Sequence, residues 1–311
     1  MTLDPQAKWV LDIAIEAKVT LLEDMSAKEA KVAYEDRAQK LCIKDVPIGK
    51  TDDFSIDGPN GEIPLRLYTP VDAKDYLPVV VFCHGGGWVI GSRDSHDSLC
   101  RQIANQGQFL VVSVDYRMGP EAPFPAAPID AFAAYKWACQ NIGEFGGDAS
   151  KIAVAGDSAG GNLSAVICLM ARAENIQAPC FQWLIYPATN MHMDTSSHRD
   201  FADGYFLTNS LMAWFQGHYL KSDIDKDDWR ASPLLAEDLS NLPPALIQTA
   251  GFDPLKEEGI AYANALTAAG GTITHTDYPG MIHGFINIGG VIDAAKVATQ
   301  EGVEALKAAF A

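Results

Sequence analysis

Short apolar runs alternate with helix-forming segments along most of this 311-residue chain, and that rhythm restricts the folds it can adopt. Continuous apolar runs of this length are typical of strands buried on both faces, and the segments between them have the spacing of helices. We therefore expect an α/β fold, with a mostly parallel central sheet and helices on both of its faces. The predicted strands are residues 78–83, 109–114, 151–155, 181–186, 244–249 and 272–278, after a hairpin at 54–57 and 63–68, and the predicted helices are residues 95–106, 128–141, 159–173, 256–268 and 291–311.

Two segments interrupt the alternation. Residues 1–48 precede every predicted strand and place apolar residues such as Trp9 and Ile13 at helical spacing. Residues from about 188 to 240 contain no clear strand but are rich in aromatic and methionine side chains. We expect the two segments to form a helical cap over the carboxyl ends of the strands, where open α/β sheets bind ligands, although ordinary helix packing explains each aromatic residue equally well. The remaining chain, residues 49–311 without the insertion, is the predicted main domain.

Composition narrows the classes of partner. The chain has 23 Lys and Arg against 40 Asp and Glu, a net charge of −17, with no basic cluster, which argues against nucleic acid and anionic membranes. No apolar stretch approaches the roughly 20 residues that cross a bilayer, and the first residues do not resemble a signal peptide. The six cysteines are scattered without a C-x-x-C pair, as in reduced proteins. We expect a cytoplasmic protein without membrane insertion, metal or cofactor, whose ligand is a small molecule.

A serine lies at one predicted junction between strand and helix. The segment Gly156-Asp157-Ser158-Ala159-Gly160 has the pattern G-x-S-x-G, directly after the predicted strand 151–155. In this context the pattern predicts a sharp turn that exposes the serine hydroxyl, with glycines where strand and helix approach closely. Taken alone, the pattern is also compatible with a turn that has no catalytic role. Ser158 is therefore a candidate nucleophile that needs a base, an acid and an oxyanion hole elsewhere in the chain.

The position of a base follows from chain order. In α/β folds with such a serine, the acid and then the histidine follow it, each after a strand. Of the seven histidines, two precede Ser158 and three lie in the strandless interval before the next strand. Of the remaining two, His275 lies inside strand 272–278 and is expected to be a surface residue, whereas His283 follows that strand in a glycine-bracketed loop. We therefore predict His283 as the general base.

The acid is expected after the preceding strand. Asp253 stands at the exit of the predicted strand 244–249, so we predict that it orients His283. An aspartate before proline is also a favoured N-cap, and N-capping of the next helix is an alternative role. Glu257 and Glu258 are alternative acids, but they are expected in the first turn of that helix, where carboxylates offset the helix dipole.

Three successive glycines follow the predicted strand 78–83. Such a run exposes backbone N–H groups that can stabilise the negative charge of a tetrahedral intermediate. We predict an oxyanion hole made by Gly86 and Gly87, with the N–H of Ala159 as third donor. A flexible loop is the alternative. However, the run directly follows a strand, at the place where α/β folds with a G-x-S-x-G serine have their oxyanion loop.

Five motifs occur in order: H-G-G-G-W at 84–88, D-Y-R-M-G-P-E at 115–121, G-D-S-A-G-G-N at 156–162, D-P-L at 253–255 and H-G-F at 283–285. Through them, residues 50–311 resemble the hormone-sensitive-lipase-like esterases, the bacterial family IV carboxylesterases of the α/β-hydrolases. The resemblance implies an α/β-hydrolase fold with a helical cap, no cofactor or metal, and a homodimer as one option. It also implies that Asp157 ties neighbouring loops. Met118-Gly119 departs from the Leu-Ala more common in the family.

The function that these residues predict is a serine carboxylesterase for short- to medium-chain acyl esters, acting through an acyl-enzyme on Ser158. The preference for shorter chains comes from the resemblance alone. Two alternatives stay open. The first is an amide or lactone hydrolase, because these bonds are cleaved through the same kind of oxyanion by the same residues. The second is a receptor that binds a small molecule without catalysis, as the plant gibberellin receptor does on a related scaffold that lacks the histidine. The presence of His283 counts against the receptor.

Overall fold

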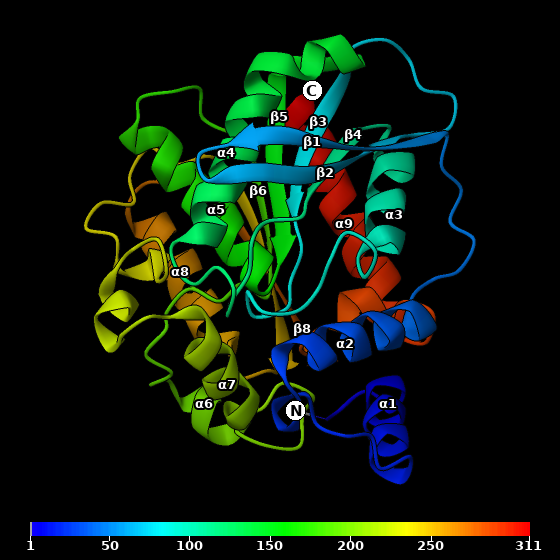
Figure 1. The fold of residues 1–311 in the computed structure, drawn as a ribbon, viewed down its shortest axis with the longest axis vertical. Helices are drawn as coiled ribbons and strands as arrows, with labels where there is room; N and C mark the ends of the chain where they lie inside the picture. Colours follow the sequence, from blue (N-terminus) through cyan, green and yellow to red (C-terminus); the bar gives the residue numbers. More distant parts are fainter. Residues whose placement is uncertain (1) are drawn as a thin grey trace.

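An eight-stranded sheet runs through residues 2–311, the part of the chain that the computed structural model describes (Figure 1). Its strand order is β1-β2-β4-β3-β5-β6-β7-β8. β1 and β2 form an antiparallel hairpin, β2 pairs antiparallel with β4, and all further neighbours pair in parallel. This confirms the predicted mostly parallel sheet. The strands are β1 (Lys50–Gly58), β2 (Gly61–Thr69), β3 (Leu77–Cys83), β4 (Leu110–Val114), β5 (Gly147–Asp157), β6 (Gln182–Ile185), β7 (Ala245–Phe252) and β8 (Ile273–Ile282).

Helices cover both faces of the sheet, as expected. On one face, α4 (Ala126–Asn141), α5 (Ala159–Ala173) and α8 (Lys256–Ala268) pack against the apolar core that contains Val79 and Val81. On the other face, α3 (Asp97–Gly107) and α9 (Asp293–Phe310) pack against the core that contains Val80 and Phe82. The alternation along β3 follows from the pleat, because successive side chains of a strand point to opposite faces. A strand buried on both faces is mainly apolar, which is why β3 appears in the sequence as a nearly continuous apolar run.

The end of β8 differs from the prediction. Residues 279–282 were expected in a loop, but they continue the strand, and the register shifts where β7 passes from Ala250 to Phe252. The cause is a close approach of the two backbones at Gly251, where an added Cβ would lie 2.1 Å from the carbonyl oxygen of Pro279. The loop before His283 is therefore shorter than expected, and this histidine follows the last strand residue, Ile282, directly.

Further helices lie beyond the carboxyl ends of the strands, at the lower end of Figure 1: α1 (Pro5–Glu16), η1 (Leu22–Asp24), α2 (Ala27–Leu41), α6 (Ser196–Asp200) and α7 (Asn209–Tyr219). The first three come from the predicted cap segment and the last two from the predicted insertion. The two segments touch, since Ser210 donates a hydrogen bond of 2.7 Å to Glu23. Met1, the first residue of the predicted cap segment, lies outside the described residues. The division into cap and main domain stays a prediction.

The described residues also bear on the expectations from composition. All six cysteines are free thiols. Across residues 2–311, none of the helices combines the length and the apolar character that a membrane crossing requires.

Candidate active site

Ser158 stands on the turn between β5 and α5. Its backbone has φ 57° and ψ −118°, a conformation that residues other than glycine rarely adopt. Its N–H donates to the carbonyl of Ile185 at 2.8 Å, which anchors the turn to β6. An added Cβ on Gly160 would lie 1.9 Å from the carbonyl oxygen of Cys83, and one on Gly156 would lie 2.4 Å from the backbone of Gly160. Only glycine fits at these two positions, so the helix packs directly on the strands and leaves the Ser158 hydroxyl at the carboxyl edge of the sheet.

The structure brings the three predicted triad residues together. Nε2 of His283 lies 2.9 Å from Oγ of Ser158, and Nδ1 of His283 lies 2.7 Å from Oδ2 of Asp253. Asp253 is fully buried and His283 is almost so, whereas Ser158 is partly exposed. When Nδ1–H donates to a carboxylate, the opposite ring nitrogen is left as an acceptor. This arrangement can take the proton of the Ser158 hydroxyl.

Asp253 uses its second oxygen to shape its own loop. Oδ1 accepts the N–H of Leu255 at 2.9 Å. The N-cap of α8 is Leu255 and not Asp253, so the alternative role as N-cap is wrong in detail. The carboxylate nevertheless organises the turn that precedes the helix, and this contact fixes Oδ2 in the direction of His283.

Glu257 and Glu258, the alternative acids, point elsewhere. Glu257 accepts the N–H groups of Ser196 and Ser197 at 2.7 and 3.1 Å, and Glu258 accepts that of Thr189 at 2.6 Å. Neither glutamate forms a hydrogen bond with His283 in the described structure. Both contact the residues that lead from β6 into α6.

Gly86 and Gly87 form the turn that follows β3. Both have positive φ, 121° and 59°, and the carbonyl of Gly86 accepts the N–H of Ile90 at 2.9 Å. The close contact of Gly160 with Cys83 brings the start of α5, and with it Ala159, to this turn. The N–H groups of Gly86, Gly87 and Ala159 donate to no protein acceptor within residues 2–311. Three free donors at one place can receive a developing oxyanion.

Asp157, the neighbour of the nucleophile, ties three loops as the family resemblance implies. It accepts the N–H of Gly85 at 2.9 Å and the side-chain amide of Asn287 at 3.0 Å, and it lies 3.1 Å from Nε2 of His96. Burial would raise the pKa of Asp157, but the nearby His96 and the donated hydrogen bonds outweigh it and hold the pKa below its usual value. The sequence carried no signal for His96 or Asn287 as its partners.

His84 supports the glycine turn from below. Its buried ring stacks on that of Tyr116 with 4.4 Å between centroids, and its Nδ1 lies 2.8 Å from the carbonyl oxygen of Gly85. The Tyr116 hydroxyl donates to the backbone carbonyl of His84 at 2.7 Å. Burial lowers the pKa of His84 to about 3, so the ring is neutral. The second residue of the 115–121 motif, Tyr116, thus supports the glycine turn through His84.

Gly119, the departure from the family pattern, has a steric reason. An added Cβ would lie 2.3 Å from the carbonyl oxygen of His218, at the end of α7. The more common alanine would therefore collide with this helix. Glycine allows α7 to approach the loop that supports the site.

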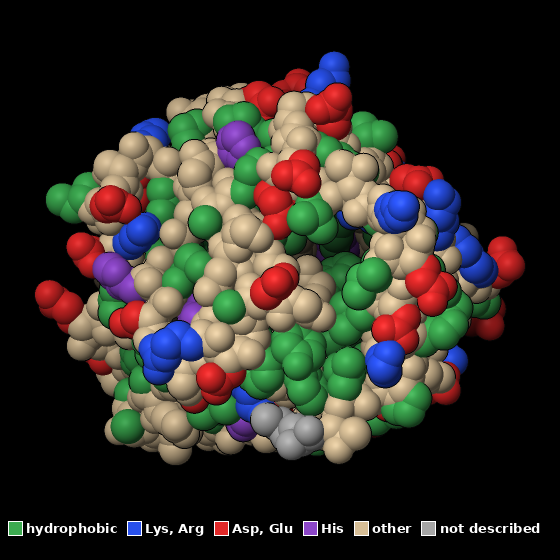
Figure 2. Space-filling model, turned by 90° about the horizontal axis from the view of Figure 1, so that it is seen from below, with side chains coloured by type: hydrophobic (Ala, Val, Ile, Leu, Met, Phe, Trp, Pro, Cys, Tyr) green, Lys and Arg blue, Asp and Glu red, His purple; other side chains and the backbone are tan. Residues whose placement is uncertain are grey.

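Aromatic residues of the insertion approach the triad and the glycine turn. The ring of Phe215 occupies the position where a Cβ on Gly87 would lie, within 2.2 Å of it, and Phe206 is 3.2 Å from the corresponding point on Gly284. Tyr186, which follows β6, has its ring centroid 4.6 Å from that of His283. Figure 2 views this end of the molecule and shows a hollow bordered by hydrophobic side chains. Sequence reasoning found these aromatic residues but not their contacts with the site.

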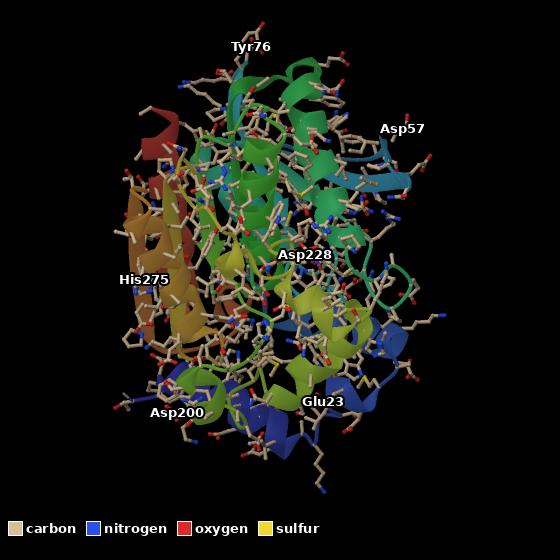
Figure 3. All side chains as sticks on the ribbon, turned by 90° about the vertical axis from the view of Figure 1, so that its left-hand side faces the viewer. Glu23, Asp57, Tyr76, Asp200, Asp228 and His275 are labelled. Carbon is tan, nitrogen blue, oxygen red and sulfur yellow. The ribbon has the colours of Figure 1, made fainter. Side chains whose placement is uncertain are left out.

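His275 lies apart from the site. It is exposed on β8, the edge strand, where its Nε2 lies 2.9 Å from the hydroxyl of Thr249. Figure 3 shows it on the outer side of the sheet, between the two ends of the molecule. The structure therefore places His275 on the surface, as its strand position predicts.

Comparisons with known proteins agree with this architecture. A family model described as alpha/beta hydrolase fold matches residues 80–287. The carboxylic ester hydrolase LipN of Mycobacterium tuberculosis is 47% identical over 99% of this chain and 83% of its own length. The carboxylesterase NlhH of the same organism is 45% identical over 80% of this chain and 79% of its own. Among solved structures, the hyperthermophilic esterase of the archaeon Pyrobaculum calidifontis superposes with a TM-score of 0.95 at 42% identity, covering 99% of both chains.

Proposed function

This chain belongs to the hormone-sensitive-lipase-like, family IV carboxylesterases of the α/β-hydrolase superfamily and is a carboxylic ester hydrolase, and we propose that it cleaves short- to medium-chain acyl esters through an acyl-enzyme on Ser158. The observation that carries the proposal is the continuous contact from Ser158 through His283 to Asp253, beside three backbone N–H groups without a protein acceptor. Nucleophile, base, orienting acid and oxyanion donors then lie within one site.

In the proposed mechanism, Oγ of Ser158 attacks the ester carbonyl while its proton passes to Nε2 of His283. Asp253 keeps the ring in the required tautomer and stabilises the imidazolium that forms. The carbonyl electron pair moves onto the oxygen, which the N–H groups of Gly86, Gly87 and Ala159 stabilise. The carbon–oxygen bond to the leaving alcohol breaks, and the alcohol takes its proton from His283.

The second half of the proposed reaction removes the acyl group from Ser158. Water enters where the alcohol left, and His283 takes one of its protons as the oxygen attacks the acyl carbon. The second tetrahedral intermediate uses the same three N–H donors and collapses with release of the carboxylic acid. His283 returns its proton to Oγ of Ser158, so the site ends in its starting state.

The proposed preference for short and medium acyl chains concerns the cap, residues 1–48 and about 188–240. Phe206 and Phe215 come from this insertion and lie against Gly284 and Gly87. Bulky rings at these two places narrow the space beside the nucleophile, which supports a limit on the length of the acyl chain. A cytoplasmic location and a homodimer stay predictions.

A series of p-nitrophenyl esters from acetate to palmitate, with wild type and Ser158→Ala, tests the proposal. We expect turnover that depends on Ser158 and falls with chain length, and a phosphonate that labels Ser158 stoichiometrically. His283→Ala is expected to abolish turnover, whereas His275→Ala keeps it. Equal rates for wild type and Ser158→Ala on every ester would contradict the acyl-enzyme, and a preference for palmitate would contradict the chain-length proposal.

The amide and lactone alternatives pass through the same oxyanion, so the same variants apply to them. Anilides and lactones matched to the preferred acyl group separate these bonds. We expect the ester to be turned over faster than the matched anilide, because the anilide is the poorer leaving group. A receptor without catalysis would bind a ligand but leave every one of these substrates intact.

A further inference from the structure

A buried glutamate and a buried histidine face each other behind the loop of Asp253. Nε2 of His198, on α6, lies 3.4 Å from Oε2 of Glu258, in the first turn of α8. The two side chains are 1% and 0% exposed. Within residues 2–311 neither of these two atoms has a hydrogen-bond partner in the geometry of the structure. Two orphaned polar atoms that face one another in the interior are costly unless they share a proton.

The remaining polar atoms of the two side chains are held by the insertion. Oε1 of Glu258 accepts the N–H groups of Thr189 and Asn190 at 2.6 and 3.3 Å. Nδ1 of His198 lies 2.6 Å from the hydroxyl of Thr195. Both ends of the segment 189–198 therefore meet at Glu258.

The same segment touches the catalytic loops. Ala188, directly before it, donates its N–H to the carbonyl of Ser158 at 3.3 Å. Ser197, within it, donates its hydroxyl to the carbonyl of Pro254 at 2.6 Å, next to Asp253. A displacement of Glu258 would consequently shift the backbone beside Ser158 and the loop that carries Asp253.

The charges around the two side chains are mainly negative. Asp253, Asp194 and Glu257 act on them from neighbouring segments, and Arg199 contributes a positive charge near His198. Burial raises the pKa of Glu258 well above its usual value, and the nearby carboxylates of Asp253 and Asp194 act in the same direction against the N–H groups of Thr189 and Asn190. Burial also lowers the pKa of His198. Both directions favour an uncharged pair that holds one proton between carboxyl and imidazole.

We propose that Glu258 and His198 form a positioning pair, in which the un-ionised carboxyl of Glu258 donates to Nε2 of His198 and fixes segment 189–198 against the loop of Asp253. The proposal rests on the proposed role of Asp253 as the triad acid. The pair touches no reacting atom and acts through Asp253 and Ser158. Ionisation of Glu258 would remove the donor and add a second buried carboxylate near Asp253, so the pair weakens as the pH rises.

The test compares Glu258→Gln, Glu258→Ala and, as a control on the exposed side of α9, Glu304→Gln. Glutamine keeps an oxygen for Thr189 and offers an N–H to His198 in place of the carboxyl proton. We expect Glu258→Gln to keep kcat within about threefold of wild type, and Glu258→Ala to lose about tenfold or more in kcat. If Glu258→Gln is damaged as badly as Glu258→Ala, the carboxyl is not the neutral donor and the proposal is wrong.

The pH profile supplies a readout that simple loss of packing would not change. As the pH rises above 4.5, the ordinary Glu value, wild type and Glu304→Gln are expected to lose thermal midpoint, and they lose kcat as Glu258 ionises. Glu258→Gln is expected to keep both to higher pH. If wild type and Glu258→Gln lose kcat and thermal midpoint in the same way as the pH rises, the proposal is overturned, even if Glu258→Ala fails to fold. The thermal midpoints are measured without any activity, so they test the Glu258–His198 pair independently of ester hydrolysis. Ester hydrolysis itself is tested by Ser158→Ala.

Discussion

Replacing Ser158 by glycine is expected to make the protein more stable than replacing it by alanine, although both variants lose the nucleophile. The backbone of Ser158, at φ 57° and ψ −118°, lies in a region that costs a residue with a Cβ about 1–3 kcal/mol. Alanine keeps this strain, and glycine removes it. Both variants lose the contact of 2.9 Å with His283, so that loss cancels in the comparison.

The magnitude is the strain relieved less the extra freedom of glycine in the unfolded chain. That freedom costs about 0.4–1 kcal/mol relative to alanine, which leaves Ser158→Gly more stable than Ser158→Ala by roughly 1 kcal/mol. An unfolding entropy of about 2.1 cal/mol/K per residue over 311 residues gives roughly 650 cal/mol/K. The difference in thermal midpoint is then about 1.5 °C.

Scanning calorimetry of the two variants measures this difference, with an ester assay to verify that both are inactive. Ser55 provides the matched control, because it is an exposed residue of the extended strand β1. There the order should reverse, with Ser55→Gly less stable than Ser55→Ala, since glycine weakens a strand. If Ser158→Gly is no more stable than Ser158→Ala, the turn stores no strain and the reasoning is refuted.

Two further predictions concern the glycine turn and its support. Gly87→Ala keeps the backbone N–H, but its new Cβ would lie 2.2 Å from the ring of Phe215, so the turn must shift and this oxyanion donor is displaced. We expect kcat/KM to fall by about 100-fold, as for the loss of one oxyanion donor. Gly217→Ala, where a Cβ meets nothing within 4 Å, should keep full activity, and equal rates for the two variants would contradict the assignment. The pKa of His84 is lowered from 6.5 to about 3, so its ring is protonated at higher pH in the unfolded chain than in the folded protein. The free energy of unfolding therefore decreases as the pH falls below 6.5, by on the order of 3 kcal/mol at pH 4. Thermal midpoints of wild type and His84→Asn across this range measure it, and parallel curves would show that another group is responsible.

The strands that the sequence predicted well are those whose local pattern and final environment agree. β4, β6 and β7 are buried at every position and β3 at every position but Pro78, so apolar residues predominate in each, with a few buried polar residues such as Ser113 and Gln248. The beginning of β5 was missed because Gly147–Ser150 is polar and becomes a strand through its place beside β3, where Gly147 pairs with Leu77. The end of β8 was missed for a similar reason, since Phe252 pairs with Ile282 across a shifted register. Pairing between distant strands leaves no trace in a local window.

The triad was predictable because chain order and topology act together. Each predicted residue follows a strand of a parallel sheet, and the carboxyl ends of such strands meet at one edge. Contacts between loops were not predictable in this way. Asp157 ends β5, His96 precedes α3 and Asn287 lies in the short helix η5 (Phe285–Ile288), so their mutual distances depend on how separate parts of the chain meet at the sheet edge. The aromatic residues of the insertion are a similar case, because the path of the segment that carries Phe206 and α7 decides which ring meets which glycine.

The three acids after β7 show how one short segment serves two purposes. Asp253 precedes α8, so its side chain is free of the helical direction and reaches the residue after β8, His283. Glu257 and Glu258 are successive helical residues and point about 100° apart, one to Ser196 and the other to Thr189 and His198. The sequence favours Asp253 over the two glutamates because it stands before the helix, and the start of α8 does separate them. In our proposals, the first carboxylate therefore orients the base, whereas Glu258 positions the insertion above it, so substitutions should act on the chemistry at Asp253 and on its pH range at Glu258.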